Sequence, residues 1–282
     1  MPAAQPEVLF PHLPRFAGLV ERWTARGTPG TAPATPGAIL ICEHASNALP
    51  VDWPELGGDL GISAQTRASH AAWDIGALGV ARGLAPEIAT ACGGAVLVHA
   101  PLSRLVYDLN RAPDHPGAMP ETSEIHPIPG NRNLTDAQKL ARIVAVRQPF
   151  HTTLSDVVME TVALGRRPVL IAVHSFTPVY MGQARAVEFG VLSDDDDALA
   201  FAILRAAEGC GLECAYNEPY SAKGDVAHTT RMHAGPLRLR NTMLEIRNDL
   251  ITGADQQEEM AARLAPVLIE ALDACDLTNR QR

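Results

Sequence analysis

The sequence has little positive charge and no basic cluster. Lysine and arginine number 23 against 32 aspartates and glutamates, which gives a formal net charge of −9. Proteins that bind nucleic acids or anionic membrane surfaces usually gather their basic residues, so we expect neither as a partner. A small anionic substrate is compatible with this balance, because it needs only a few arginines at one site.

Cysteine, long apolar runs and targeting signals are scarce too. No apolar stretch reaches about 18 residues, so no transmembrane helix is expected, and the N-terminus lacks the basic flank and apolar run of a signal peptide. The cysteines are odd in number and show no C-x-x-C spacing, which favours reduced thiols and a cytoplasmic protein over a disulfide framework. They are Cys42, Cys92, Cys210, Cys214 and Cys275.

The sequence does contain enough apolar residues for a sizeable core. With 282 residues and a hydrophobic share of 46%, it suits one large α/β domain or at most two small ones. Residues 1–36 are rich in Pro, Gly, Ala and Thr, and we expect an irregular N-terminal arm on the surface. Residues 37–282 are expected to form a single α/β domain. The oligomeric state does not follow from the sequence.

Short apolar runs alternate with segments of helical periodicity. Continuous apolar strands are typical of a sheet covered on both faces, so the pattern predicts an α/β sandwich around a parallel or mixed sheet. The expected strands are 38–42, 95–99, 168–173 and 241–246, with 189–193 as a further candidate. The expected helices are 69–85, 135–165, 194–209 and 254–275. Pro149 should break or kink the second helix, and residues 112–134 form a long loop.

Ionisable residues stand at the ends of three expected strands. The first strand is followed by Glu43 and His44, the third ends near His174, and the fourth holds Glu245 and Arg247. Two histidines at the ends of two strands and a carboxylate at the end of a third suit a catalytic zinc site, in which the metal lowers the pKa of water and a carboxylate takes its proton. The alternative is that each histidine is an ordinary hydrogen-bonded residue and that Glu245 pairs with Arg247.

The segment "SRLVYDLNR", residues 103–111, adds candidates for substrate binding. Arg104, Asn110 and Arg111 lie within eight residues of one another, and arginine is well suited to bidentate recognition of a carboxylate. A surface strand with salt bridges is the other interpretation. The apolar residues between them argue against it, because they would draw part of the segment inward.

Six short motifs together resemble the N-formylglutamate amidohydrolase family. They occur in the order "CEHASNALP", "HAAWDIGA", "SRLVYDLNR", "VHSFTP", "NEPYS" and "LEIRNDLI", and the resemblance runs from about residue 37 to about residue 270. The family is similar to zinc carboxypeptidases and aspartoacylase. The resemblance therefore implies a zinc carboxypeptidase/phosphorylase-hydrolase-like fold, a three-layer α/β sandwich with a mixed central sheet.

The resemblance also implies roles for individual residues. His44 and His174 match zinc ligands, although another divalent metal could replace zinc. Arg104 matches the arginine that polarises the scissile carbonyl, and Glu245 matches the general base. The pair that binds a substrate carboxylate matches Asn110 and Arg111. Further residues are weaker candidates, Arg185 and Arg247 for a second carboxylate and Tyr220 and His228 for closing over the site.

The third metal ligand departs from the relatives' pattern. Their His-x-x-Glu carboxylate falls on Asn47, and a neutral amide is a poor zinc ligand. Asp74 is the first choice in its place and Glu43 the second, although an extended strand would point Glu43 away from His44. His70 lies four residues before Asp74, on the same face of the expected helix, and is a candidate ligand or supporting residue.

The implied activity is metal-dependent hydrolysis of the N-formyl or short N-acyl group of an acidic amino acid such as N-formylglutamate. A zinc peptidase or a deacylase for other N-acyl amino acids is an alternative. Another is a metal-free amino-acid-binding protein, because Asn47 replaces a ligand. A serine or cysteine hydrolase has little support, since no G-x-S-x-G occurs and Cys42 is expected in the core.

Overall fold

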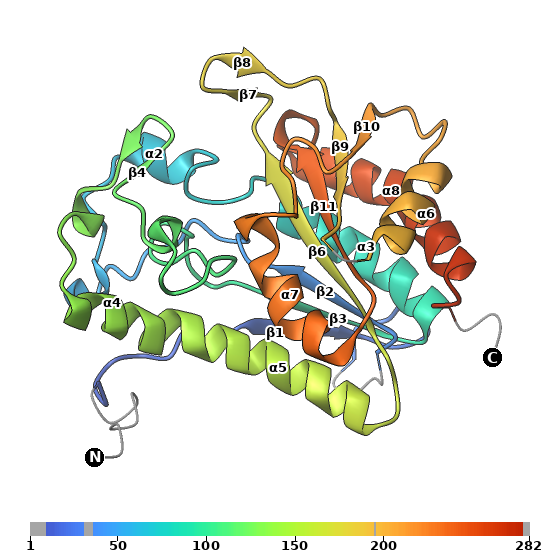
Figure 1. Ribbon diagram of the computed structural model, residues 1–282, viewed down its shortest axis with the longest axis horizontal. Helices are drawn as coiled ribbons and strands as arrows, with labels where there is room; N and C mark the ends of the chain where they lie inside the picture. Colours follow the sequence, from blue (N-terminus) through green and yellow to red (C-terminus); the bar gives the residue numbers. More distant parts are fainter. Residues whose placement is uncertain (1–9, 31–35, 195, 279–282) are drawn as a thin grey trace.

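A mixed sheet of seven strands forms the centre of the computed structural model, which describes residues 10–30, 36–194 and 196–278 (Figure 1). The order across the sheet is β1-β3-β2-β6-β11-β9-β10. Strands β3, β2, β6 and β11 are parallel to one another, whereas β1 and β9 run antiparallel to β3 and β11. The strands are β1 Leu19–Trp23, β2 Ala38–Cys42, β3 Ala95–His99, β6 Val169–Phe176, β9 Phe189–Leu192, β10 Cys214–Tyr216 and β11 Asn241–Arg247.

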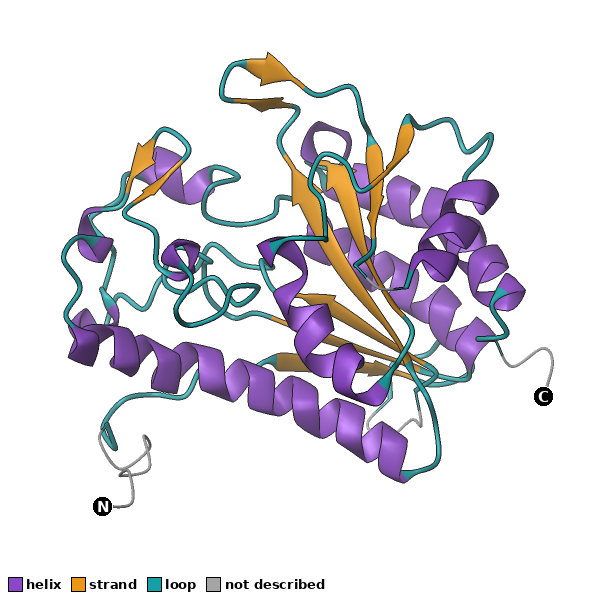
Figure 2. Ribbon diagram, viewed as in Figure 1, coloured by secondary structure: helices purple, strands orange, loops and turns teal. Residues whose placement is uncertain are grey.

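Helices cover both faces of this sheet, so the molecule has three layers (Figure 2). One face carries α3 Ala77–Cys92, α6 Asp197–Ala206 and α8 Ala254–Ala274; the other carries α4 Asp136–Arg142, α5 Gln148–Ala163 and α7 His228–Ala234. Helix α2 is Ala64–Ala68, and two hairpins, β4–β5 (Thr122–Ser123, His126–Pro127) and β7–β8 (Val179–Tyr180, Gln183–Ala184), stand apart from the sheet. Short 3₁₀ turns are Pro54–Leu56, Pro116–Ala118, Pro129–Asn131, Asp225–Ala227, Gly235–Leu237 and Asn248–Leu250.

Alternation along the strands divides the core into two halves. In β2, Leu40 and Cys42 pack toward α3 and α8, whereas Ile39 and Ile41 pack toward α5. Each of the central strands is buried along its whole length or nearly so, which explains their continuous apolar sequences. The predicted three-layer fold with a mixed sheet is confirmed, and Cys42 lies in the core as predicted.

The sequence predicted the buried strands well and the edge strands poorly. The five expected strands are all present, but β10 was not predicted and β1 lies inside the segment expected to be irregular. Strand β1 is an edge strand and is only partly buried, so it can carry the charged residues Glu21 and Arg22 in its centre. Glu21 accepts a hydrogen bond from Arg82, and Arg22 donates one to Glu160. The expected arm residues 1–9 and 31–35 lie outside the described part of the chain.

Pro149 does not end its helix. The helical segment runs from α4 through a π-helical turn at Ile143–Arg147 into α5, and Pro149 lies in the first turn of α5. Proline has no N–H to donate to the carbonyl four residues earlier. That carbonyl, of Ala145, instead accepts a hydrogen bond from the backbone N–H of Phe16 at 2.8 Å. The carbonyl left without a helical donor by Pro149 therefore holds the N-terminal segment through Phe16.

All five cysteines are free thiols within the described residues. No helix in that same part of the chain is both long and apolar enough to cross a membrane.

Candidate functional site

Adjacent parallel strands bring His174 and Glu245 together. The register pairs His174 of β6 with Glu245 of β11, and paired residues of parallel strands project from the same face of a sheet. Gly190 of β9 is the partner of Glu245 on the other side. A side chain at this position is excluded, because a Cβ atom would collide with the carbonyl oxygen of Glu218. The sheet is thus built closely around Glu245.

His44 and Asp74 reach the same place from loops. His44 is the second residue after β2, and its carbonyl accepts a hydrogen bond from the backbone N–H of Asp74 at 2.9 Å. Residues 69–76 were expected to be helical, but the helix begins only at Ala77, because Gly76 before it has a left-handed backbone (φ +80°). The expectation that His70 and Asp74 share a helical face was therefore wrong.

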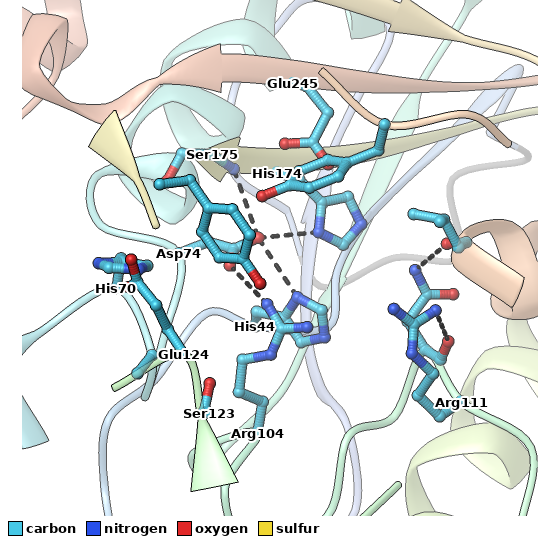
Figure 3. Close-up of a pocket in the computed structure, with 15 residues that line it drawn as sticks. His44, His70, Asp74, Arg104, Arg111, Ser123, Glu124, His174, Ser175 and Glu245 are labelled. Atoms are coloured by element: carbon cyan, nitrogen blue, oxygen red, sulfur yellow. Dashed lines mark hydrogen bonds and ion pairs between the residues drawn. The ribbon is translucent and has the colours of Figure 1, made fainter. Parts of the chain in front are cut away.

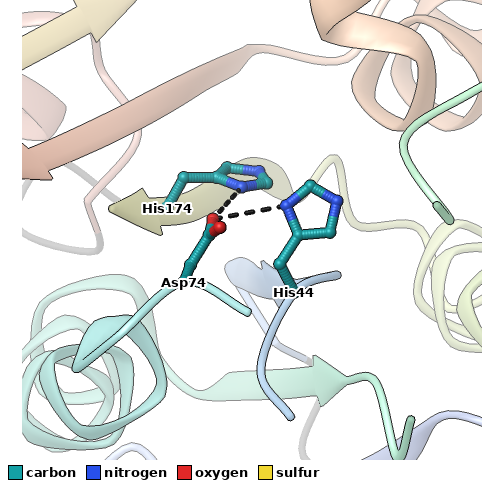
Figure 4. Close-up of side chains that lie close together, drawn as sticks. All are labelled: His44, Asp74 and His174. Carbon is teal, nitrogen blue, oxygen red and sulfur yellow. Dashed lines mark hydrogen bonds and ion pairs between the residues drawn. The ribbon is translucent and has the colours of Figure 1, made fainter. Parts of the chain in front are cut away.

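His44, Asp74 and His174 form a compact buried cluster (Figure 4). Asp74 Oδ2 lies 2.8 Å from His174 Nδ1 and 3.3 Å from His44 Nδ1. One ligand atom from each residue lies within 4.8 Å of the others, well inside the roughly 6 Å beyond which two imidazoles could not share an ion. All three side chains are at most 4% exposed.

Two further carboxylates stand behind the imidazoles. His44 Nε2 donates to Asp108 Oδ1 at 2.7 Å, and Glu43 Oε2 lies 3.2 Å from His174 Nε2, close enough for an ion pair but not aligned for a hydrogen bond. Each ring therefore has a carboxylate at its outer nitrogen and presents its Nδ1 to Asp74. Carboxylates in this position orient metal-bound histidines and increase their basicity.

These carboxylates set the charge of the cluster. Burial and Arg104 would lower the pKa of His44, but Asp108 and Asp74 outweigh them and raise it. Burial would also lower the pKa of His174, yet Glu43 and Asp74 raise it well above its usual value. Despite burial, the two histidines hold the pKa of Asp74 far below its usual range. The cluster is a place of negative potential that favours a bound cation.

The donor set suits a divalent metal. If His44 Nε2–H donates to Asp108, the Nδ1 lone pair faces a carboxylate oxygen, and two lone pairs in that arrangement need a cation between them. Donors bound at 2.0–2.1 Å to one tetrahedral ion lie about 3.3 Å apart, close to the separations around Asp74 Oδ2. Two imidazole nitrogens and one carboxylate are also a ligand set found in catalytic zinc sites, which leave a position for water.

Glu245 has the environment of a proton acceptor. Its side chain is almost fully buried, and no described residue donates a hydrogen bond to its Oε2 atom. Burial raises the pKa of Glu245 to about 7, although the charge of His174 acts in the opposite direction. A carboxyl group with a pKa near neutrality can both take up and release a proton at physiological pH.

The cluster opens into a cavity of about 200 Å³ (Figure 3). Arg104 lies beside the cluster, where it donates to Asp74 Oδ1 at 3.3 Å and to Asp108 Oδ2 at 2.7 Å. The lining residues come from the sheet strands β6 and β11, from loops and from both hairpins: His44, His70, Ala71, Asp74, Arg104, Asn110, Arg111, Ser123, Glu124, His174, Ser175, Tyr180, Tyr220, Val226 and Glu245.

The segment that carries Arg104, Asn110 and Arg111 is held by buried polar contacts. Arg142, nearly inaccessible to solvent, donates to the carbonyl of Val106 at 3.1 Å. Asn110 donates through Nδ2 to the carbonyl of Val226 and accepts at Oδ1 from the backbone N–H of Thr229. One Nδ2 hydrogen of Asn110 remains for a ligand, and Arg111 lines the cavity beside it.

Two of the predicted substrate-binding arginines lie outside the cavity lining formed by the described residues. Arg185 is stacked among the rings of Phe176, Tyr180 and Tyr220 and donates to the Tyr220 hydroxyl at 2.9 Å, so it supports two aromatic walls of the cavity. Arg247 pairs with Glu188 at 3.1 Å and with Asp249 at 2.9 Å. Their roles in binding a second carboxylate stay predictions.

Of the remaining candidates, some line the cavity and others lie elsewhere. Asn47 donates to the carbonyl of Arg67 and is not among the described residues that line the cavity. His70 lines the cavity and pairs with Glu124 at 2.8 Å. His228 lies 3.4 Å from a guanidinium nitrogen of Arg147, whereas Tyr220 is part of the lining.

Sequence reasoning missed Asp108 and Glu124. Asp108 lies in the middle of the quoted segment between Arg104 and Asn110, but its contact with His44 spans 64 positions and has no local signature. Glu124 lies in the long loop 112–134, whose length was the only signal of function. The positions of both side chains depend on tertiary contacts between segments that are far apart in the sequence.

Comparisons with known proteins agree with the fold and give the family. A family model described as N-formylglutamate amidohydrolase matches residues 37–252. A crystal structure of gene product Atu2144 from Agrobacterium tumefaciens is 43% identical with a TM-score of 0.82, covering 93% of this chain and 100% of that chain. An N-formylglutamate amidohydrolase from Ralstonia eutropha JMP134 is 18% identical with a TM-score of 0.60, covering 95% and 100%.

An aspartoacylase family protein from Mesorhizobium loti is 13% identical with a TM-score of 0.32, covering 86% of this chain and 59% of that chain. The search of curated proteins found no match.

Proposed function

The chain belongs to the N-formylglutamate amidohydrolase family, and from that premise we propose that it hydrolyses the amide bond of an N-formyl or other short N-acyl amino acid in a metal-dependent reaction. Family membership supports an amide hydrolase. The family is named for N-formylglutamate, which is therefore the reference substrate.

The observation that carries this proposal is the position of Glu245 beside the His44–Asp74–His174 cluster. A buried carboxylate with a pKa near 7 lines the same cavity as the only described group of three side chains spaced to hold a metal. This pairing of a cation site with a proton acceptor is what hydrolysis of an unactivated amide requires.

His44, Asp74 and His174 would hold the metal, with zinc as the first candidate. A divalent ion in that position supplies Lewis-acid polarisation and lowers the pKa of water to about 7. Asp108 and Glu43 keep the two imidazoles oriented with Nδ1 toward Asp74.

The other side chains supply proton transfer, charge stabilisation and binding. Glu245 accepts a proton from water and returns it to the nitrogen of the leaving amine. Arg104 holds its charge beside the cluster, where it stabilises negative charge that develops on the carbonyl oxygen, and donors placed in advance in this way are usually a large contribution to catalysis. Arg111 and the free Nδ2 hydrogen of Asn110 bind the carboxylate of the amino acid.

A substrate assay tests the proposal. Protein purified without chelator should release formate from N-formyl-L-glutamate or acetate from N-acetyl amino acids, and dialysis against a chelator should abolish release until a divalent metal is added. Failure of the metal-containing protein to cleave any N-formyl or N-acyl amino acid would contradict the proposal. Binding of amino acids without turnover would instead favour a binding protein.

A further inference from the structure

The cavity has opposite charges at its two ends. Figure 3 shows Arg111 on one side of His44, and His70 and Glu124 on the other side. All four residues line the same cavity. A molecule whose scissile amide lies at the cluster and whose carboxylate reaches Arg111 therefore directs its acyl group toward Glu124.

Glu124 is a carboxylate held in place at its end of the cavity. Its Oε2 lies 2.8 Å from His70 Nε2, and its Oε1 accepts a hydrogen bond from the backbone N–H of Met181 in the β7–β8 hairpin at 2.9 Å. Burial lowers the pKa of His70 even though Glu124 opposes this. His70 therefore favours its neutral form, in which Nε2–H donates to the Glu124 carboxylate.

Glu124 also has capacity for another donor. A carboxylate offers about four lone-pair positions, and His70 and Met181 occupy two of them. The Glu124 side chain is 11% exposed and lines both the first cavity and a second one beside it. A cationic group arriving there would meet a fixed, partly desolvated acceptor.

The space around Glu124 extends beyond the first cavity. A second cavity of about 280 Å³ adjoins the first and shares Ala71, Arg104, Arg111, Ser123, Glu124 and Tyr180 with it. A substrate carboxylate placed directly against Glu124 would be repelled by it, since like charges at close range in a poorly solvated site are unfavourable.

We infer that the site accepts amino acids whose N-acyl group carries a positively charged amine, as in a dipeptide, and that Glu124 binds this ammonium group. The inference rests on the proposed amide hydrolysis at the cluster and extends its substrate class from formyl and acetyl groups to aminoacyl groups. Glu124 is then a specificity-determining residue.

Binding to the metal-free protein tests the inference without catalysis. The probes are 5-aminopentanoate, which has the backbone length of a dipeptide with ammonium and carboxylate ends, and pentanoate, which lacks the ammonium. Calorimetric titration should show about tenfold tighter binding of 5-aminopentanoate, because a hydrogen bond to a charged group typically contributes this much. Equal affinities, or no binding of either at millimolar concentration, would overturn the inference.

Two variants assign the effect to one side chain. Glu124→Gln keeps an oxygen for the Met181 N–H and should remove the preference for 5-aminopentanoate. Glu121→Gln is the matched control, since Glu121 lies on the same loop, is exposed, and contacts Asn133. It should bind both probes as the wild type does. A preference that survives in Glu124→Gln would overturn the inference.

Kinetics separates this inference from the proposed function. Glycyl-L-alanine and N-acetyl-L-alanine differ only in the amino group, so the metal-loaded wild type should show about tenfold higher kcat/KM for the glycyl substrate, and Glu124→Gln should not. Turnover of N-acetyl-L-alanine with no glycyl preference would overturn the inference alone. Absence of turnover for both substrates, with the binding preference intact, would contradict the proposed hydrolysis instead.

Discussion

Two pairs of buried histidines lie in this protein, and they differ in their affinity for positive charge. His44 and His174 in the cluster are 3% and 2% exposed, and His151 and His233 between α5 and α7 are 3% and 5% exposed. The pKa values of the first pair are raised, whereas burial lowers that of His151 to about 3 and that of His233 to about 4.

The partners explain the difference. His151 Nε2–H donates to the carbonyl of Leu109 at 3.1 Å, and its Nδ1 accepts from His233 Nε2–H at 2.9 Å, so both rings are satisfied as neutral groups. Arg147 nearby adds to the cost of protonation. His44 and His174 instead face Asp74, with Asp108 and Glu43 behind them. Equal burial therefore gives opposite charge preferences, and only the carboxylate-lined pair suits a metal ion.

The largest expected effect comes from removing a cluster histidine. His174→Ala should lose bound metal and reduce kcat/KM on the order of 10⁴-fold or more, because the metal provides several kcal/mol of transition-state stabilisation. The matched variant His151→Gln should keep its metal. Metal content and hydrolysis rates of both proteins are the measurements, and loss of metal from His151→Gln alone would reverse the comparison.

Replacing the proton acceptor should separate metal binding from turnover. Glu245→Gln is expected to keep the metal, since Glu245 lies outside the cluster, and to reduce kcat about 10²–10⁴-fold, the usual contribution of general acid–base catalysis. Elemental analysis and steady-state kinetics on one preparation check this. Normal turnover by Glu245→Gln would assign the base to another residue.

A smaller effect is expected from the carboxylate behind His44. Asp108→Asn removes the charge that holds Nε2 and should weaken metal binding about 10–100-fold, as is typical of such outer partners. Competition against a metal-chelating dye gives the affinity. Asp156→Asn serves as a control that should bind metal unchanged, because Asp156 lies in α5 on the same side of the sheet and does not line the cavity.

The neutral pair predicts an effect on stability and none on metal binding. The unfolded chain protonates His151 and His233 near pH 6.5, but the folded protein does so only near pH 3 and pH 4. Between pH 6.5 and about 4 the unfolded state therefore binds more protons, and the free energy of unfolding falls as the pH falls. Each histidine contributes about 1.4 kcal/mol per pH unit in this window.

Urea unfolding of metal-free protein at several pH values measures this dependence. The double variant His151→Gln/His233→Gln should show a shallower fall in the free energy of unfolding between pH 6.5 and pH 4 than the wild type. An unchanged slope would mean that the two histidines titrate normally in the folded protein.

Strands that are apolar at every position could be predicted from the sequence. Contacts between segments far apart in the chain could not. Strand β2 is apolar at every position because both of its faces are covered, and this is visible in the sequence. The edge strand β1 carries Glu21 and Arg22 and has no such signal. Helix α3 begins later than the sequence periodicity suggests. The expected first turns are not helical, because Gly76 has a left-handed backbone and the Asp74 backbone N–H donates to the carbonyl of His44.

The same limit applies to the site. His44, His174 and Glu245 could be proposed because they follow or end buried strands, and neighbouring parallel strands deliver their ends to one edge. Asp108 and Glu124 could not, because their partners, His44 and Met181, lie 64 and 57 positions away. The sequence alone does not encode such pairings in any local pattern.

The most direct measurement is anomalous X-ray scattering from a crystal of the zinc-containing protein. We predict one peak within about 2.0–2.1 Å of His44 Nδ1 and His174 Nδ1 and bound by an Asp74 oxygen, with none beside His151 or His233. An ordered zinc ion at another place, or an empty cluster in protein that hydrolyses N-acyl amino acids, would contradict the account.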